Sequence, residues 1–295
     1  MKAIQVTNYG GPEVASVQSV DVPIKNKGEV LVRIVASSVN PVDIKHMTPG
    51  TVQEIEQFPM VLGWDIAGVV MEADADSIFQ AGDRVLALHP QGSWQQIVTV
   101  KENQLLKLPD DIDFVHGASI PLGAVTALQA LRKLKIKQGE TLLVTGAMGS
   151  VGGYAIELAK QAKISVAGLV RSKEQKKICE DLFDVTIYVS GETVPAFDTV
   201  FDTAGILERT EILQPKGRLI TVSDDKVSPE VEERALWTEH NFVRTSQEDL
   251  QTVIALFSKG KLHSRIEAVY SMNEIQEALK HASQSGNNGK TIIVF

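Results

Sequence analysis

"ETLLVTGAMGSVGGYAIELAKQAK", residues 140–163, combines a short apolar run, a group of glycines and a segment with helical periodicity. The run at 141–145 is apolar and β-branched, which predicts a strand. It leads directly into glycines at 146, 149 and 152, and the residues beyond them repeat apolar side chains at the spacing of a helix face. Strand, glycine turn and helix in this order direct the amides of a helix N-terminus toward a phosphate, and therefore predict a dinucleotide-binding turn. The alternative is a tight strand-to-helix turn that holds no ligand.

The strand expected next, at 165–170, ends in three residues that bear on this prediction. In folds that prefer NAD, a carboxylate about 20 residues past the glycines binds the ribose hydroxyls. Here Arg171 follows Gly152 by 19 residues, and Ser172 and Lys173 come next. Cationic and hydroxyl groups bind a 2′-phosphate, which a carboxylate would repel, so the sequence predicts NADPH in preference to NADH. A solvent-exposed helix start with incidental basic residues is the other interpretation.

The composition of the 295-residue chain is that of a globular protein, with 43% hydrophobic and 22% charged residues. Its net charge of −8 gives no general basic surface for nucleic acid or anionic lipid. The one cysteine excludes an intramolecular disulfide and a multi-thiolate metal site, and fits a reducing compartment. The N-terminus has no leader pattern, and no apolar run approaches the ~20 residues of a membrane helix. We therefore expect a cytoplasmic protein that binds neither nucleic acid nor membrane.

Two kinds of pattern divide the chain. Residues 1–116 alternate short β-branched runs with turn signals, which predicts a mostly β unit. Residues 117–263 alternate short apolar strands with helical segments, which predicts a parallel sheet covered on both faces. Residues 264–295 contain an amphipathic helix near 273–283 and a final strand near 291–295, and we expect them to return to the first unit. The fold class is therefore α/β, with a β-rich domain and a doubly wound domain.

Four stretches carry a family pattern. They are SSVNPVDIKHMTPG at 37–50, FPMVLGWDIAGVV at 58–70, GAMGSVGGYAIELAK at 146–160, and the closing segment SKGKLHSRIEAVYSMNEIQEALKHASQSGNNGKTIIVF. They resemble the medium-chain dehydrogenase/reductase superfamily, specifically its zinc-free quinone oxidoreductase-like branch. The resemblance implies a GroES-like catalytic domain at 1–116, completed by 264–295, and a Rossmann domain at 117–263. It further implies that nicotinamide and substrate bind in a cleft between the two, and that the protein is a homodimer.

The resemblance also implies which residues contact the cofactor. The expected cofactor-binding residues are Thr126, Gly146, Ala147, Met148, Gly149, Ser150, Val151, Arg171, Ser172, Lys173, Ala204, Gly205, Thr221, Val222 and Ser223. Those from 146 to 151 form the pyrophosphate loop, and those from 171 to 173 lie at the adenosine end. The last five follow the fourth and fifth strands. Thr126 matches the family's threonine near the nicotinamide and phosphate; alternatively, it is a helix-interior threonine that bonds to its own backbone.

Zinc-dependent relatives have a Cys near the position of Asn40 and a His-Glu pair where this chain has Trp64 and Asp65. Because these positions carry neither a thiolate nor an imidazole, we expect no metal site. The alternative is an ad hoc site assembled from Asp43, Asp65, His46 and His89. Without a Lewis acid, a simple alcohol is a poor substrate because its proton must leave. A quinone or an enone spreads the incoming charge and needs only hydrogen-bond donors near the developing oxyanion.

Three residues are expected in the substrate site. Asn40 is the preferred polar group, because its amide can donate to a carbonyl and it stands where relatives place a metal ligand. Asp43 is expected to organise the loop, since an aspartate after proline is often an N-cap, although proton transfer is the alternative. Trp64, together with Trp94, would provide an apolar wall for a flat ring, unless both are plain core. No pair of residues at recognisable spacing marks a proton donor.

These observations predict an NADPH-dependent oxidoreductase that transfers hydride to a quinone or an α,β-unsaturated carbonyl without zinc. One alternative is a 2-enoyl thioester reductase, which would need a tyrosine donor and a long acyl channel. Another is a non-catalytic NADPH-binding protein that acts as a sensor or a structural component.

Overall fold

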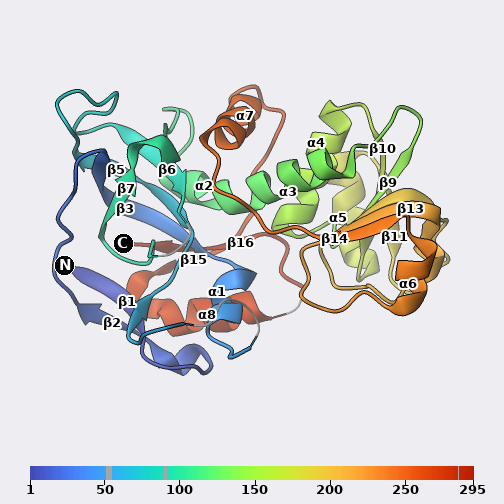
Figure 1. The fold of residues 1–295 in the computed structure, drawn as a ribbon, viewed down its shortest axis with the longest axis horizontal. Coiled ribbons are helices and arrows are strands. Elements are labelled where there is room, and N and C mark those ends of the chain that lie inside the picture. Colours follow the sequence, from blue (N-terminus) through green and yellow to red (C-terminus); the bar gives the residue numbers. More distant parts are fainter. Residues whose placement is uncertain (51–54, 90–91, 285) are drawn as a thin grey trace. The chain divides into compact units, whose positions relative to one another are not determined.

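The computed structural model describes residues 1–50, 55–89, 92–284 and 286–295. The chain forms two compact units. The first unit comprises Met1–Leu122, Thr245–Ser258 and Ser264–Phe295, and the second unit comprises Gly123–Arg244 and Lys259–His263. Both ends of the chain therefore belong to the first unit (Figure 1).

The second unit is built on a six-stranded sheet in which every pairing is parallel. In spatial order its strands are β11 (Thr186–Val189), β10 (Ser165–Val170), β9 (Thr141–Thr145), β12 (Phe197–Asp202), β13 (Leu213–Thr221) and β14 (Trp237–His240). Counted along the chain this is the order 3-2-1-4-5-6, so the predicted doubly wound sheet is confirmed. Its helices are α3 (Pro121–Leu134), α4 (Ser150–Gln161), α5 (Lys173–Phe183) and α6 (Pro229–Arg234).

β9 occupies the centre of this sheet because its side chains are apolar on both faces. Leu142, Leu143 and Val144 are fully buried, and β9 pairs with β10 on one side and with β12 on the other. The direction of winding reverses at this point, and in open α/β sheets ligands bind outside the carboxyl ends of the strands at such a switch point. The glycine turn that follows β9 begins there.

The first unit contains two sheets among its described residues. The larger has seven strands: β15 (Ile266–Ser271), β16 (Lys290–Val294), β3 (Glu29–Val39), β5 (Asp65–Glu72), β6 (Arg84–Leu88), β8 (Leu105–Lys107) and, paired with β3, β7 (Ile97–Lys101). The smaller has three strands: β2 (Ala15–Ser19), β1 (Lys2–Val6) and β4 (Met60–Val61). The helices of this unit are α1 (Pro41–His46), α2 (Phe114–Ser119), α7 (Gln247–Phe257) and α8 (Ile275–Ser283). Short 3-10 turns lie at Pro12–Val14, Glu102–Gln104 and Met272–Glu274 here, and at Thr210–Ile212 in the second unit.

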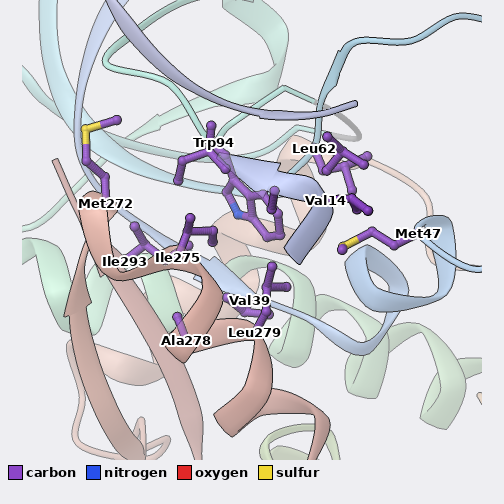
Figure 2. Close-up of a cluster of buried hydrophobic side chains, with 13 residues drawn as sticks. Val14, Val39, Met47, Leu62, Trp94, Met272, Ile275, Ala278, Leu279 and Ile293 are labelled. Carbon is purple, nitrogen blue, oxygen red and sulfur yellow. The ribbon is translucent and has the colours of Figure 1, made fainter. Parts of the chain in front are cut away.

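The closing segment completes the first unit. β16 pairs antiparallel with β3 and parallel with β15, so it lies inside the large sheet. α8 packs on a buried apolar cluster whose largest member is Trp94 (Figure 2). The labelled side chains of that cluster are Val14, Val39, Met47, Leu62, Trp94, Met272, Ile275, Ala278, Leu279 and Ile293. Residues from both ends of the sequence thus share one core.

The elements agree with the sequence patterns except at a few places. β3 and β16 fall where alternating apolar runs predict strands, and α8 where the amphipathic pattern predicts a helix. The structure assigns 117–122 and 245–258 to the first unit, whereas the sequence-based division placed them with the second; the division into domains stays a prediction. β14 was not anticipated, because WTEH has no alternating apolar pattern. Among the helices of the described residues, none combines the length and the apolarity required to cross a bilayer.

Candidate functional site

The glycine turn between β9 and α4 has a steric reason for each end. Gly146 has φ 62°, the left-handed region that favours glycine. A Cβ on Gly152 would lie 2.3 Å from the carbonyl oxygen of Gly146, so no larger residue fits there without moving the turn. A Cβ on Gly149 would meet only that same oxygen, at 3.2 Å, within its surroundings. Gly149 is the N-cap of α4, and a glycine there leaves the space over the helix N-terminus without a side chain.

Asp202, at the carboxyl end of β12, holds together the strand ends beside this turn. Its carboxylate accepts hydrogen bonds from the hydroxyls of Thr145 (2.6 Å) and Thr221 (2.9 Å). It also accepts from the backbone N–H groups of residues 204, 205 and 206, at 3.2 to 3.3 Å. Ala204, Gly205 and Thr221, three of the expected cofactor residues, are thereby fixed by one buried carboxylate. Val222 and Ser223 continue from β13, and their N–H groups bond to the backbone oxygen of Asp202 and to the Thr221 hydroxyl.

The basic residues after β10 lie at the start of α5. Ser172 is the N-cap of this helix, and its hydroxyl accepts from the N–H of Gln175 at 3.2 Å. Arg171 and Lys173 are exposed, and within the described residues no hydrogen bond or ion pair engages the guanidinium of Arg171 or the ammonium of Lys173. Both cationic groups are therefore available to a ligand, while the serine hydroxyl has a structural role as well.

Thr126 lies on α3 and is almost fully buried. Its hydroxyl has no hydrogen-bond partner within the described residues, so the alternative of a threonine bonded to its own helix backbone is not what the structure contains. Ala147 and Met148, in the glycine turn, are also buried, and the Met148 sulfur lies 3.4 Å from the Cys179 sulfur of α5. These two residues of the expected phosphate loop therefore anchor it to the protein.

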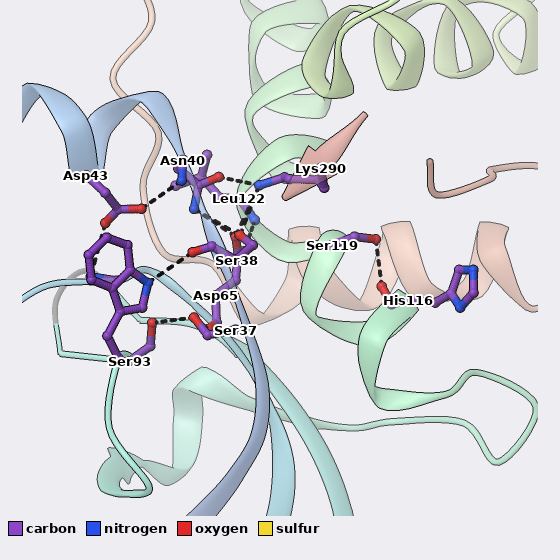
Figure 3. Close-up of polar contacts among 12 residues, drawn as sticks. Ser37, Ser38, Asn40, Asp43, Asp65, Ser93, His116, Ser119, Leu122 and Lys290 are labelled. Carbon is purple, nitrogen blue, oxygen red and sulfur yellow. Dashed lines mark hydrogen bonds and ion pairs between the residues drawn. The ribbon is translucent and has the colours of Figure 1, made fainter. Parts of the chain in front are cut away.

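A group of charged and polar side chains is buried in the first unit, and we call it the buried polar cluster: Ser38, Asn40, Asp65 and Lys290. Lys290, the first residue of β16, points its ammonium at this group (Figure 3). The ammonium donates to Ser38 Oγ (3.2 Å), to Asp65 Oδ2 (3.2 Å) and to Asn40 Oδ1. Asp65 Oδ1 accepts from the N–H of Leu122 at 2.7 Å, so its carboxylate is satisfied on both oxygens. The Asp65 side chain is fully buried and the Lys290 side chain 6% exposed.

Asn40 is held by this cluster through every polar atom of its side chain. Its amide nitrogen donates to Ser38 Oγ at 3.1 Å and to Asp65 Oδ2 at 2.9 Å, and its oxygen accepts from Lys290. In this arrangement the amide has no hydrogen left to donate to a substrate carbonyl. The expected donor role of Asn40 stays a prediction, and it requires one of these two bonds to open.

Asp43 is the third residue of α1, whose N-cap is Asn40, so the expectation that Asp43 is itself the N-cap is corrected. Its buried carboxylate accepts from the backbone N–H of Asn40 at 2.8 Å and of Gly63 at 3.0 Å. These bonds join the start of α1 to the turn that precedes β5, as expected of a loop-organising residue. Burial raises the pKa of Asp43 to about 7, because removal from water disfavours the charged form more than the two N–H groups favour it.

The aromatic residues separate into two environments. Trp94 is fully buried in the apolar cluster of the first unit, and its indole N–H donates to the carbonyl of Ser38 at 3.1 Å. Trp94 is therefore core, as one of the two interpretations held. Trp64 is partly exposed and lies 6.3 Å from the ring of His46, centroid to centroid.

The residues of the alternative metal site do not assemble into one. Within the described ranges, no three His, Cys, Asp or Glu side chains are grouped as a metal ion would need. The two oxygens of Asp43 and the two of Asp65 accept hydrogen bonds from protein groups. His46 bonds through Nδ1 to the carbonyl of Val42 at 2.9 Å, and burial lowers the pKa of His46 and of His89.

Three of these positions were missed by sequence reasoning. Asp202 carries a local signal, since an acidic residue directly after a buried parallel strand stands at the ligand-binding edge of the sheet. Lys290 and Ser38 carry none, because their partners are distant in sequence: Lys290 lies 225 residues from Asp65 and 252 from Ser38. A lysine before an apolar strand is ordinarily a solvated residue.

Comparison with known proteins agrees with this architecture. The family model of the alcohol dehydrogenase GroES-like domain matches residues 26–110, and that of zinc-binding dehydrogenase matches residues 183–293. A quinone oxidoreductase of Lama guanicoe is 29% identical over 327 residues, covering 100% of this chain and 98% of that protein. An NADPH-dependent alkenal/one oxidoreductase of Arabidopsis thaliana is 26% identical, covering 99% of this chain and 79% of that protein. The structure of the quinone oxidoreductase from Coxiella burnetii superposes with a TM-score of 0.90 at 25% identity, covering 100% of this chain and 99% of that one.

The GroES-like unit and the doubly wound unit define an oxidoreductase, and the chain belongs to the medium-chain dehydrogenase/reductase superfamily. Within that superfamily it belongs to the quinone oxidoreductase-like branch.

Proposed function

We propose that this protein reduces a quinone or an α,β-unsaturated carbonyl with NADPH and without zinc. The observation that carries the proposal is the dinucleotide turn followed by an unpaired arginine: β9, the glycine turn and α4, with the Arg171 guanidinium free at the end of the next strand. The names of the relatives, quinone oxidoreductase and NADPH-dependent alkenal/one oxidoreductase, support the substrate class and the cofactor.

The residues present fit a nicotinamide dinucleotide. The turn from Gly146 to Val151 would hold the pyrophosphate, because Gly149 keeps the helix N-terminus open to it. Arg171 and Lys173 would bind the 2′-phosphate through charge-assisted hydrogen bonds. When bound, the reduced nicotinamide supplies a hydride. The protein's part is to fix the dinucleotide at the strand ends that Asp202 joins, and to exclude a carboxylate from the adenosine end.

The donor set supports a reaction without zinc. At the positions of Asn40 and Asp65 a metal would have to displace the ammonium of Lys290, which already bonds to both side chains. Zinc prefers thiolate and imidazole ligands, and Asn40 and Trp64 supply neither. The buried polar cluster instead contains a fixed positive charge. We propose that Asn40 and Lys290 act together, Lys290 orienting the amide of Asn40 so that it can turn toward a carbonyl oxygen as negative charge develops there.

The test is steady-state oxidation of NADPH and NADH, followed by the loss of reduced-nicotinamide absorbance, with a panel of benzoquinones, naphthoquinones, enones and simple ketones. We expect turnover with quinones or enones and NADPH, and no alcohol oxidation. Treatment with a zinc chelator should leave the rate unchanged. Saturable NADPH binding without turnover on any acceptor would favour a sensor, and turnover restricted to enoyl thioesters would favour the thioester reductase.

The cofactor preference is tested at one residue. Arg171→Ala should weaken NADPH binding about 10- to 100-fold, the effect of one to two charge-assisted hydrogen bonds, and leave NADH binding unchanged. Lys177→Ala, an exposed lysine on the same helix, is the matched control and should change neither. Equal affinity of the unchanged protein for the two dinucleotides would refute the preference.

A homodimer and a cytoplasmic location remain part of the proposal. β14 is the last strand of its sheet and pairs with β13 alone among the described strands. Leu236 and Phe242, on either side of it, are 61% and 71% exposed. An unpaired edge strand flanked by apolar side chains favours pairing with a second copy, because it would otherwise leave backbone groups and apolar surface in water. The cytoplasmic location rests on the single, buried cysteine.

A further inference from the structure

Two buried oxygen atoms in the second unit lack hydrogen-bond partners within the described residues: the hydroxyl of Thr126 and the side-chain carbonyl of Asn241. Thr126 is 4% exposed and Asn241 3% exposed. Buried polar side chains in folded proteins almost always have a partner, and each exception calls for an explanation such as a ligand. Neither residue has another described contact that would satisfy the atom in question.

The two residues are joined to one another. The amide nitrogen of Asn241 donates to the backbone carbonyl of Thr126 at 3.2 Å. Only the NH₂ group of the amide can donate to a carbonyl, so this bond fixes which way the amide is turned. The Oδ1 atom is therefore the free one, and it is a pure acceptor. The Thr126 hydroxyl beside it can donate or accept.

Their place in the fold is the ligand-binding edge of the sheet. Asn241 directly follows β14, and its backbone N–H donates to the carbonyl of Thr221 at the end of β13, at 2.7 Å. Ligands of open α/β sheets bind outside the carboxyl ends of the strands. The pair therefore stands at the same edge as Asp202 and the glycine turn, on strands farther along the sheet.

The chemistry of the pair matches one group. An acceptor-only oxygen next to a hydroxyl is complementary to a primary carboxamide, whose N–H donates to the first and whose carbonyl accepts from the second. We propose that Asn241 and Thr126 form a receptor for the carboxamide of the nicotinamide ring, with Asn241 Oδ1 accepting its N–H and Thr126 Oγ1 donating to its carbonyl. The proposal rests on the nicotinamide cofactor of the proposed function and adds Asn241 as a residue that fixes the ring's orientation.

The experiment compares two dinucleotides on the same protein sample by equilibrium binding. One is NADP⁺, and the other is its 3-acetylpyridine analogue, in which a methyl replaces the NH₂ and the carbonyl is kept. The unchanged protein should bind NADP⁺ about tenfold more tightly, because the analogue leaves Asn241 Oδ1 unpaired. Asn241→Leu should abolish that preference by weakening NADP⁺ binding, with the affinity for the analogue unchanged within about twofold.

Thr126 gives a second, different signature. Thr126→Val should weaken both dinucleotides by a similar factor, since both keep the carbonyl, and Thr126→Ser should restore the affinity. The ratio of the two affinities does not depend on how much of a sample is folded, so a destabilised variant still reports. A preference in the unchanged protein that Asn241→Leu leaves intact, or no preference at all, would overturn the proposal. Absence of quinone or enone turnover would overturn the proposed function but not this ratio.

Discussion

Replacing Lys290 by methionine tests the buried polar cluster most directly. Methionine fills a similar volume, so the change removes the charge and little of the packing. It leaves Asp65 fully buried with no cation, and removes the group that bonds to the oxygen of Asn40. Removal of one partner from a buried ion pair costs about 3–5 kcal/mol, because the other charge stays in a medium of low polarity.

At about 2–4 °C per kcal/mol for units of this size, the melting temperature should fall by roughly 6–20 °C. The free energy of unfolding is measured by urea denaturation, followed by the fluorescence of Trp64 and Trp94 in the first unit. The matched control is Lys107→Met, which removes an ion pair with Asp83 of similar length (2.8 Å). Because the Lys107 side chain is 55% exposed, we expect this variant to lose less than about 1 kcal/mol.

A double variant separates the charge from the packing. Asp65→Asn removes the stranded carboxylate but can still accept the N–H of Leu122, so adding it to Lys290→Met should recover part of the lost stability. If Lys290→Met costs no more than the Lys107 control, or if the double variant is no more stable than Lys290→Met alone, the ion pair is not what holds this cluster together.

Three further predictions follow from the geometry. Since burial raises the pKa of Asp43 from 3.8 to about 7, the protonated carboxyl stabilises the fold fully below about pH 4, and this contribution is lost as the pH rises through 7; the difference in unfolding free energy between the unchanged protein and Asp43→Asn, measured from pH 4 to 8, should vary with that sign. Gly152→Ala, whose Cβ would lie 2.3 Å from a backbone oxygen, should destabilise the second unit by several kcal/mol, whereas Gly149→Ala should keep the melting temperature within about 2 °C and weaken NADPH binding; equal stability of the two variants would contradict this. Leu236→Glu with Phe242→Glu should convert a dimer to a monomer in light scattering, and a monomeric unchanged protein would refute edge pairing.

The fold could be predicted because its signals are local. β3 and β9 are apolar runs bounded by turn residues, and the glycines after β9 exclude any other backbone path. β14 could not, because the four residues WTEH are stabilised as a strand only by their pairing with β13. Tertiary context of this kind overrides local propensity.

The site could be predicted less well than the fold. The phosphate turn and the basic residues after β10 were identifiable because each is contiguous in sequence. The surroundings of Asn40 were not, since a lysine 250 residues away supplies the group that engages its oxygen. The sequence therefore suggested a free amide where the structure has a bonded one. Asn241 escaped notice for the same reason: only its position beside Thr126 reveals an acceptor without a partner.

The insertion of β16 between β15 and β3 also sets the timetable of folding during synthesis. Asp65 leaves the ribosome 225 residues before Lys290, and the whole second unit is made in between. At roughly 5–20 residues per second, the carboxylate waits about 10 to 45 s for its ammonium. During that time the large sheet lacks an inner strand, and β3 presents an open edge. The part of the chain that is made first is thus finished last, and we expect nascent chains truncated before β16 to be the species that chaperones retain.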